Sequence, residues 1–245
     1  MSSEERLRFA QAIVDGLVFI KDSIAKPPSG GEGFYAALKA RTTWALVTPA
    51  IVIAYIMVFC MMLVGTGSLS DPQTLVGWGS SIGTRTTNGE WWGLATSLFG
   101  HVGIFHLIAE VAGLIQVGLL VERLVGRLAF ATVYLAAGVL ASVWTMTLHP
   151  VSVHAGAAGA IFGIYGLLLA TLILGLAQRS TLAVPVKVLA GLWPGVAAFV
   201  VYNMLAEGVV SDGMQAGLVV GFTGGMLIAG RVVSEEPPAK PIAAL

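Results

Sequence analysis

The chain has 245 residues, of which 56% are hydrophobic and 11% charged, and its 13 basic residues balance its 13 acidic ones. A water-soluble domain carries far more charge, so this composition predicts an integral membrane protein. The zero net charge argues against nucleic acid as a partner. The single cysteine, Cys60, excludes a disulfide framework within the chain, and no pattern in the sequence predicts a cofactor.

The N-terminal segment, residues 1–43, is predicted to lie in the cytoplasm. It has no apolar run behind a basic start, so we expect no cleavable signal peptide. Between residues 6 and 24 apolar side chains recur at helical spacing opposite a polar face, which predicts an amphipathic helix. This helix lies along the membrane, on a partner subunit, or over the inner face of the core. The KPPSGGEG stretch that follows predicts a hinge.

Residues 44–232 contain six apolar stretches, each close to the ~20 residues that a helix needs to cross a bilayer. In chain order they are residues 44–64, 104–121, 128–147, 157–176, 184–205 and 214–232. We therefore expect an all-α membrane domain of six transmembrane helices. Residues 233–245 are polar and rich in proline, and they predict an extended cytoplasmic tail.

The placement of lysine and arginine predicts the orientation, because cytoplasmic loops are enriched in both. With six spans and a cytoplasmic N-terminus, 12 of the 13 basic residues fall inside and only Arg85 falls outside. We expect both termini in the cytoplasm and a prokaryotic inner membrane as the location. The histidines then lie in the outer half or the outer loops, either as part of a site or through loop composition: His101, His106, His149 and His154.

Glycines recur every three or four residues in the fourth and sixth spans. They are Gly159, Gly163 and Gly166, and Gly217, Gly221 and Gly225. Small residues at this spacing let helix backbones approach closely, so these two spans are predicted to be tight neighbours.

Three clusters carry a family resemblance: GEWWGLATSLFGHVGIFHLIAE, VERLVGR and HAGAAGAIFGIYG. Together with MQAGLVVGFTGG in the last span, they resemble the rhomboid family of intramembrane serine proteases, over residues 75–230. The resemblance implies the rhomboid fold. For active members it implies that a serine opening the fourth span attacks a peptide bond and that a histidine of the sixth span takes its proton. A histidine and an asparagine of the second span then help to hold the oxyanion.

This sequence departs from that pattern at four functional positions. Ala158 stands at the serine position, and Gln215 at the position of the histidine base. In the second span His106 is retained, but Glu110 replaces the asparagine, and in the first loop Gly93 replaces an arginine. An alanine has no heteroatom to attack a carbonyl, and an amide does not act as a base near neutral pH. The sequence therefore predicts a pseudoprotease, with no catalytic residues.

Glu110 needs a partner, because a lone ionised carboxylate on an apolar helix is costly. His106 lies one turn earlier on the same face. We expect a polar cluster of His106, Glu110 and Gln215, with His154 above it, in the former active site. A zinc site is the alternative, since His and Glu are acceptable zinc ligands, but the spacing is not diagnostic and we predict no metal.

Two further alternatives are enzymatic or ligand-based. Ser152 could pair with His154 and restore hydrolysis with altered catalytic residues, or the former active-site pocket could bind a small molecule. Against both stands the simpler interpretation that these are polar loop residues at the membrane surface.

We expect the protein to act by binding transmembrane segments of partners, as the resemblance to inactive rhomboids implies. A more specific form of this expectation is a subunit of a larger membrane complex, in contact with membrane lipids. The expected surfaces are the lateral gap between the second and fifth spans, the N-terminal helix, and the first loop with Trp78, Trp91 and Trp92.

Overall fold

The computed structural model describes residues 32–65, 71–177, 184–207 and 211–234. The predicted amphipathic helix at residues 6–24 and the tail beyond residue 234 lie outside them. The longer helices are α2 (Glu32–Arg41), α3 (Val47–Gly65), α7 (Ile104–Val125), α8 (Arg127–Leu148), α9 (Ala158–Ala177), α10 (Val186–Glu207) and α11 (Asp212–Ser234). The six predicted spans correspond, in chain order, to α3, α7, α8, α9, α10 and α11. The predicted and observed bounds agree within a few residues.

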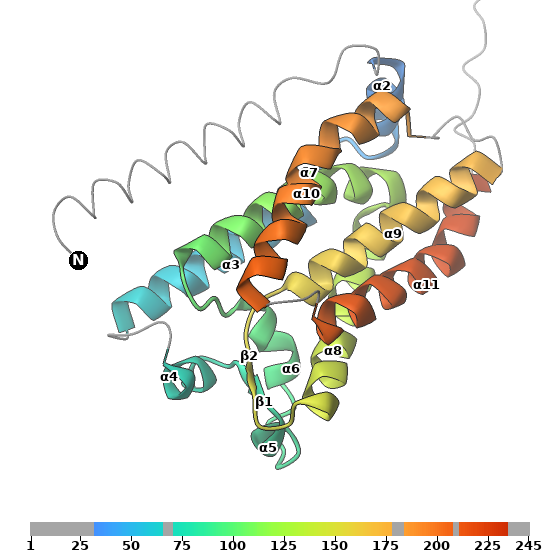
Figure 1. Cartoon of the computed structure of the whole chain (residues 1–245). Coiled ribbons are helices and arrows are strands. Elements are labelled where there is room, and N and C mark those ends of the chain that lie inside the picture. The colour runs from blue at the N-terminus through green and yellow to red at the C-terminus, as the bar shows by residue number, and fades with distance from the viewer. Residues whose placement is uncertain (1–31, 66–70, 178–183, 208–210, 235–245) are drawn as a thin grey trace, which may run out of the picture.

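Five helices within the described residues are long and apolar enough to cross a membrane: α3, α7, α8, α9 and most of α10. The sixth expected span is helical as α11, but its described part is not among the five. Long helices run side by side, and Figure 1 shows α3 beside α7 and α9 beside α11.

The loop between α3 and α7 is folded, and it forms one end of the molecule. It contains α4 (Pro72–Gly77), α5 (Gly83–Thr86), α6 (Gly93–Thr96) and the 3₁₀ helix η1 (Ser97–Phe99). Strand β1 (Ser81–Ile82) pairs in antiparallel fashion with β2 (Val153–His154), which precedes α9. In the described residues this two-stranded ribbon is the only departure from an all-α fold, and it fixes the loop that feeds α9 (Figure 1).

The predicted glycine contact between the fourth and sixth spans is confirmed. A Cβ atom at Gly217 would lie 2.0 Å from the carbonyl oxygen of Gly159, and one at Gly221 would lie 1.8 Å from that of Gly163. Both distances are far below contact distance, so only glycine allows α9 and α11 to approach this closely.

Two buried carboxylates of α7 each hold the beginning of another helix. Glu122 accepts the backbone N–H groups of Leu46 and Val47 on Oε1, at 2.6 and 2.8 Å, and that of Thr48 on Oε2, at 2.8 Å. These are the first N–H groups of α3, which have no partner within their own helix. Glu110, about 18 Å earlier along α7, does the same for α9, as described below.

Candidate functional site

The polar cluster is centred on Glu110, whose side chain is completely buried. His101 Nε2 lies 2.8 Å from Glu110 Oε2, and His106 Nε2 lies 3.0 Å from Oε1. The backbone N–H of Ala157 donates to both carboxylate oxygens, at 2.9 and 2.8 Å. A loop before α7, α7 itself and the start of α9 thus meet at one carboxylate.

His101 is flanked by hydrogen-bond acceptors on both sides. Its Nδ1 lies 3.1 Å from the carbonyl oxygen of Phe99, which can only accept. Its Nε2 faces the carboxylate of Glu110, and the imidazole is completely buried. A neutral imidazole carries one proton, so the His101–Glu110 hydrogen bond must contain a second. His106 Nε2 and the Ala157 N–H also lie within hydrogen-bond distance of Glu110, so three groups share its two oxygens.

Gly156 allows the loop before α9 to reach this carboxylate. Its φ is +115°, in the left-handed region that favours glycine. A Cβ at this position would lie 2.7 Å from His106 Cε1 and 2.8 Å from Glu110 Oε1. Its own N–H donates to the Ser97 carbonyl at 2.9 Å. Both the backbone conformation and the crowding therefore require glycine next to Ala157.

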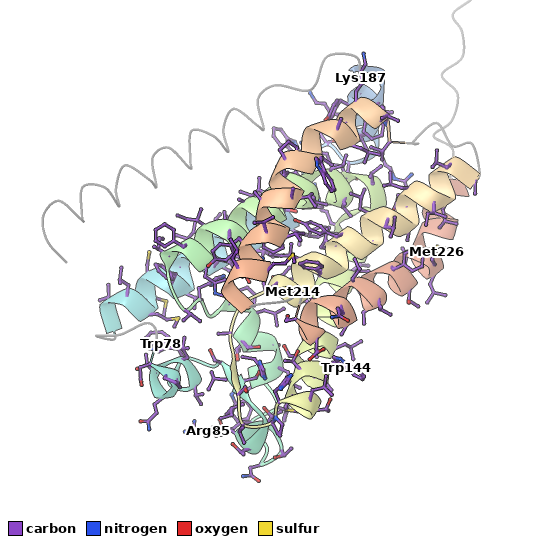
Figure 2. The ribbon with its side chains drawn as sticks, in the orientation of Figure 1. Trp78, Arg85, Trp144, Lys187, Met214 and Met226 are labelled. Atoms are coloured by element: carbon purple, nitrogen blue, oxygen red, sulfur yellow. The ribbon has the colours of Figure 1, made fainter. Side chains whose placement is uncertain are left out.

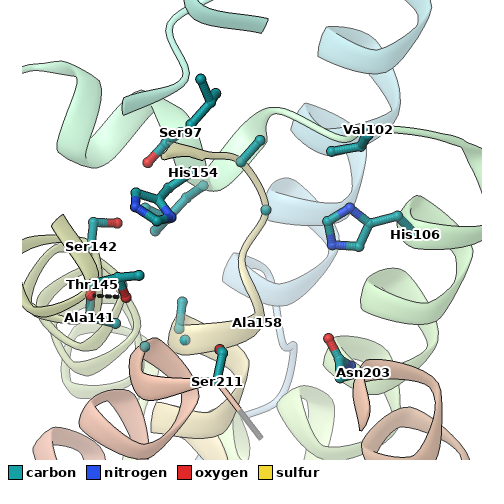
Figure 3. A pocket seen from close by; sticks show the side chains of 18 of the residues that line it. Ser97, Val102, His106, Ala141, Ser142, Thr145, His154, Ala158, Asn203 and Ser211 are labelled. Atoms are coloured by element: carbon teal, nitrogen blue, oxygen red, sulfur yellow. Dashed lines mark hydrogen bonds between the residues drawn. The ribbon is translucent and has the colours of Figure 1, made fainter. Parts of the chain in front are cut away.

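A cavity of about 720 Å³ opens beside the cluster, and Ala158, His106 and His154 all line it. Figure 3 shows His106 and His154 on opposite sides of the segment that runs into α9 at Ala158. His154 Nε2 is buried and has no hydrogen-bond partner in the described residues. Burial lowers the pKa of His154, the His149 carbonyl opposes that shift, and the charge of His149 adds to it.

The structure joins His106 to Glu110, as predicted, and places Gln215 outside the described lining of the cavity. Gln215 is exposed on α11, whereas its neighbour Met214 is 1% exposed. Within the described lining of the cavity are Ser211, which precedes α11, and Gly213 of α11, but not Gln215. One residue along a helix turns a side chain by about 100°, and the glycine contact with α9 fixes which side faces inward.

Sequence reasoning missed His101 as a partner of Glu110. Nine residues separate them, and a loop turns between them, so helical spacing gave no signal. The His-x₄-His-x₃-Glu pattern from His101 to Glu110 was the available sign. Sequence reasoning also missed the role of Glu122, a residue of the VERLVGR cluster, as the cap of α3.

The other candidate residues lie apart from the carboxylate cluster. Ser152 is exposed on the α8–α9 loop, and no hydrogen bond joins it to His154 Nε2 in the described residues. Trp91 and Trp92 are exposed and form an edge-to-face pair, with ring centroids 6.4 Å apart. Trp78 is half-buried, and a Cβ at Gly65 would lie 2.8 Å from its ring, so it packs on the end of α3.

No group of three or more His, Cys, Asp or Glu side chains in the described part of the chain has the arrangement to hold a metal ion. The geometry of the cluster explains this, because each histidine uses its Nε2 for a separate oxygen of Glu110.

A second hollow of about 400 Å³ lies between α7 and α10 and is almost entirely apolar. Two close contacts join α7 and α10 along this seam, the line where the two helices meet beside the hollow. A Cβ at Gly113 would lie 2.9 Å from the ring of Phe199, and one at Gly195 would lie 1.9 Å from Gln116 Oε1. Pro194 interrupts the hydrogen bonding of α10 at the same level. The membrane-spanning part of α10 is 17% buried, against 56% for α9, so α10 is loosely held.

Comparisons with known proteins agree with this arrangement of helices. A model of the rhomboid domain matches residues 88–235. The chain is 40% identical to "Rhomboid protease GluP" of Bacillus subtilis (strain 168) over 114 residues, which cover 46% of this chain and 22% of that protein. It is 29% identical to "Rhomboid-like protease 2" of Toxoplasma gondii over 192 residues, which cover 74% of this chain and 65% of that protein.

A third relative carries a different name. The chain is 35% identical to "Inactive RHOMBOID-like protein 8" of Arabidopsis thaliana over 89 residues, which cover 36% of this chain and 25% of that protein. The chain spans less than two thirds of the length of each of these three relatives. Because the rhomboid domain matches more than half of its residues, the chain belongs to the rhomboid family of multi-pass integral membrane proteins.

Proposed function

We propose that this rhomboid-family protein binds the transmembrane segment of a partner and does not cut it. The first support is Ala158, which begins α9 and lines the cavity where the family resemblance places a serine. Hydrolysis through a covalent intermediate needs a nucleophilic oxygen or sulfur, and a methyl group supplies neither.

The observation that carries the proposal is the position of the Glu110 carboxylate. It takes the hydrogen bonds of His106 Nε2 and of the Ala157 N–H, the donors immediately beside Ala158. Hydrolysis of a peptide bond passes through an oxyanion that needs such donors. Here they are occupied by a negative charge, which would also repel the oxyanion. Restoring a hydroxyl at position 158 would therefore not by itself restore an oxyanion site.

The seam between α7 and α10 is the proposed binding surface. It is apolar and lies at membrane depth, and one side is formed by the least buried of the five candidate spans. Gln116 lies in it as an amide that can exchange hydrogen bonds with a polar side chain of a partner helix. Displacing α10 would cost little buried area, so a partner helix can enter there.

A protease with displaced catalytic residues is the second candidate, and the names of GluP and Rhomboid-like protease 2 favour it. The specific structural observation is an acid–base pair beside the cavity: His149 Nε2 lies 3.1 Å from Asp212 Oδ2. His149, Ser152 and Ser211 all line the cavity. A carboxylate that orients an imidazole beside hydroxyl groups is the arrangement that activates a serine.

Two experiments separate the candidates. Purified protein is incubated with a fluorophosphonate probe and with a labelled transmembrane peptide, alongside Ser152→Ala and His149→Ala. We expect neither labelling nor cleavage. Cleavage by the natural chain that is lost in either variant would establish the second candidate instead.

For binding, a photo-crosslinking amino acid is placed at Ala198, which lines the α7–α10 hollow, and in a control at the exposed Leu135 of α8. We expect a discrete membrane-protein adduct from position 198 and only lipid adducts from position 135. Identical adduct patterns from the two positions would contradict the proposed surface.

A further inference from the structure

The α2 end of the molecule carries basic side chains that the proposed function does not use. Lys39 lies in the last turn of α2, Arg123 in the last turn of α7, and Arg127 at the start of α8. This end lies opposite the folded first loop, as the positions of α2 and α5 in Figure 1 show. A concentration of positive charge here calls for either acidic side chains or an external anion.

The carboxylate next to Arg123 in the chain is already occupied. Among the described side chains of residues 34–48 and of the last turn of α7, Glu122 is the only carboxylate. It is completely buried, and three backbone N–H groups of α3 occupy its two oxygens. It acts as the cap of a helix, and within the described part of the chain no carboxylate pairs with the neighbouring Arg123.

Arg123 has an unused hydrogen-bond donor. Its Nε is buried and has no partner within the described residues, and no ion pair of Arg123 is found there. A buried guanidinium N–H without an acceptor is costly, so an acceptor from outside the chain is expected. The edge of a guanidinium presents parallel N–H groups that match a phosphate or a carboxylate.

The surroundings of Arg123 are those of a membrane interface. Tyr35 lies close enough for the Arg123 charge to act on it, lowering a Tyr35 pKa that burial raises. Lys39 is one turn along α2 from Tyr35, on the same face. Arg127 donates two hydrogen bonds to the carbonyl oxygen of Trp44, at 3.1 and 2.9 Å, and Trp44 itself is exposed. Exposed tryptophan beside basic residues is typical of the level of the lipid headgroups.

We propose that Arg123, with Tyr35, Lys39 and Arg127 around it, binds the phosphate of an anionic phospholipid headgroup. A lipid fits better than free phosphate because the apolar side chains beside the cations, Leu46 and Leu128, are exposed and can contact the acyl chains. The headgroup phosphate accepts hydrogen bonds from the Arg123 guanidinium, and the other cations attract its negative charge.

The test compares Arg123→Gln with Arg85→Gln, which removes an arginine at the opposite end of the molecule, as Figure 2 shows by the positions of Lys187 and Arg85. Each purified protein is titrated with phosphatidylglycerol, with phosphatidylcholine and with inorganic phosphate, and the melting temperature is followed. We expect phosphatidylglycerol alone to raise the melting temperature of the natural chain. Arg123→Gln should bind it about fivefold more weakly, and Arg85→Gln should bind it as the natural chain does.

Equal binding by Arg123→Gln and the natural chain would overturn the site. If inorganic phosphate raises the melting temperature as much as phosphatidylglycerol does, the site binds free phosphate and not a lipid headgroup. If Arg123→Gln does not fold, lipid extracted from the purified natural chain decides the question. Enrichment of anionic lipid over the bulk membrane supports the site, and a composition equal to that of the bulk membrane contradicts it.

Discussion

Glu110 and Ala157 are joined across 47 positions of the sequence by a backbone N–H that donates to both oxygens of one buried carboxylate. This contact fixes the start of α9 against α7. It also occupies the Ala157 N–H, which immediately precedes Ala158, the position at which the family's chemistry begins. One interaction therefore joins two helices and places a carboxylate next to the start of α9.

Removing the charge of Glu110 should destabilise the protein. In Glu110→Gln the amide NH₂ must face one of the donors that now point at the carboxylate, so a buried donor loses its acceptor. We expect a loss of about 3 kcal/mol in the free energy of unfolding. The control is the same change at Glu90, an exposed residue paired with Arg85 at 3.6 Å, which should cost less than about 1 kcal/mol. Equal losses in the two variants, measured by unfolding in mixed micelles, would contradict the role of Glu110.

Gly156→Ala should be more destabilising than Gly89→Ala. Both glycines have positive φ, +115° and +108°, so both changes incur backbone strain. Only Gly156 is crowded, by His106 and Glu110, whereas nothing lies within 4 Å of a Cβ at Gly89. We expect Gly89→Ala to cost about 1 kcal/mol and Gly156→Ala about 2 kcal/mol more. Equal melting temperatures for the two variants would show that the loop can move away from the carboxylate.

Gly221→Ala and Gly224→Ala test the contact between α9 and α11 within a single helix. A Cβ at Gly221 would lie 1.8 Å from a backbone oxygen, whereas one at Gly224 would lie 3.4 Å from a Val133 methyl group, an ordinary contact. We expect Gly221→Ala to lose about 3 kcal/mol and Gly224→Ala to be neutral or to gain up to about 1 kcal/mol from helix propensity. If Gly221→Ala unfolds no more easily than Gly224→Ala, the two helices are not in backbone contact.

His154 should titrate below the ordinary value for histidine, because burial disfavours its charged form. At pH values between the lowered pKa of His154 in the folded chain and its ordinary pKa in the unfolded chain, the unfolded chain binds more protons. Stability contributed by the neutral His154 is therefore complete above about pH 6.5 and is lost as the pH falls toward the lower, folded-state pKa. The His154 ring resonance, followed by NMR against pH, checks this, and a midpoint at or above 6.5 would contradict it.

The sequence by itself determined the elements that depend on local patterns. Apolar runs of sufficient length predicted the helices, because a helix must bury its backbone polar groups when it crosses lipid. The regular glycines predicted that α9 and α11 touch. The spacing of His106 and Glu110 predicted their pairing, since side chains four residues apart lie on one face of a helix.

Only the tertiary structure decided which residues complete the site. The turn before α7 brings His101 back to Glu110, and the packing of α9 on α7 delivers the Ala157 N–H. The rotation of α11 buries Met214 and exposes Gln215, contrary to the expected cluster. Periodicity fixes which residues share a face of one helix, but the rotation of that helix against its neighbours depends on contacts between residues far apart in the chain.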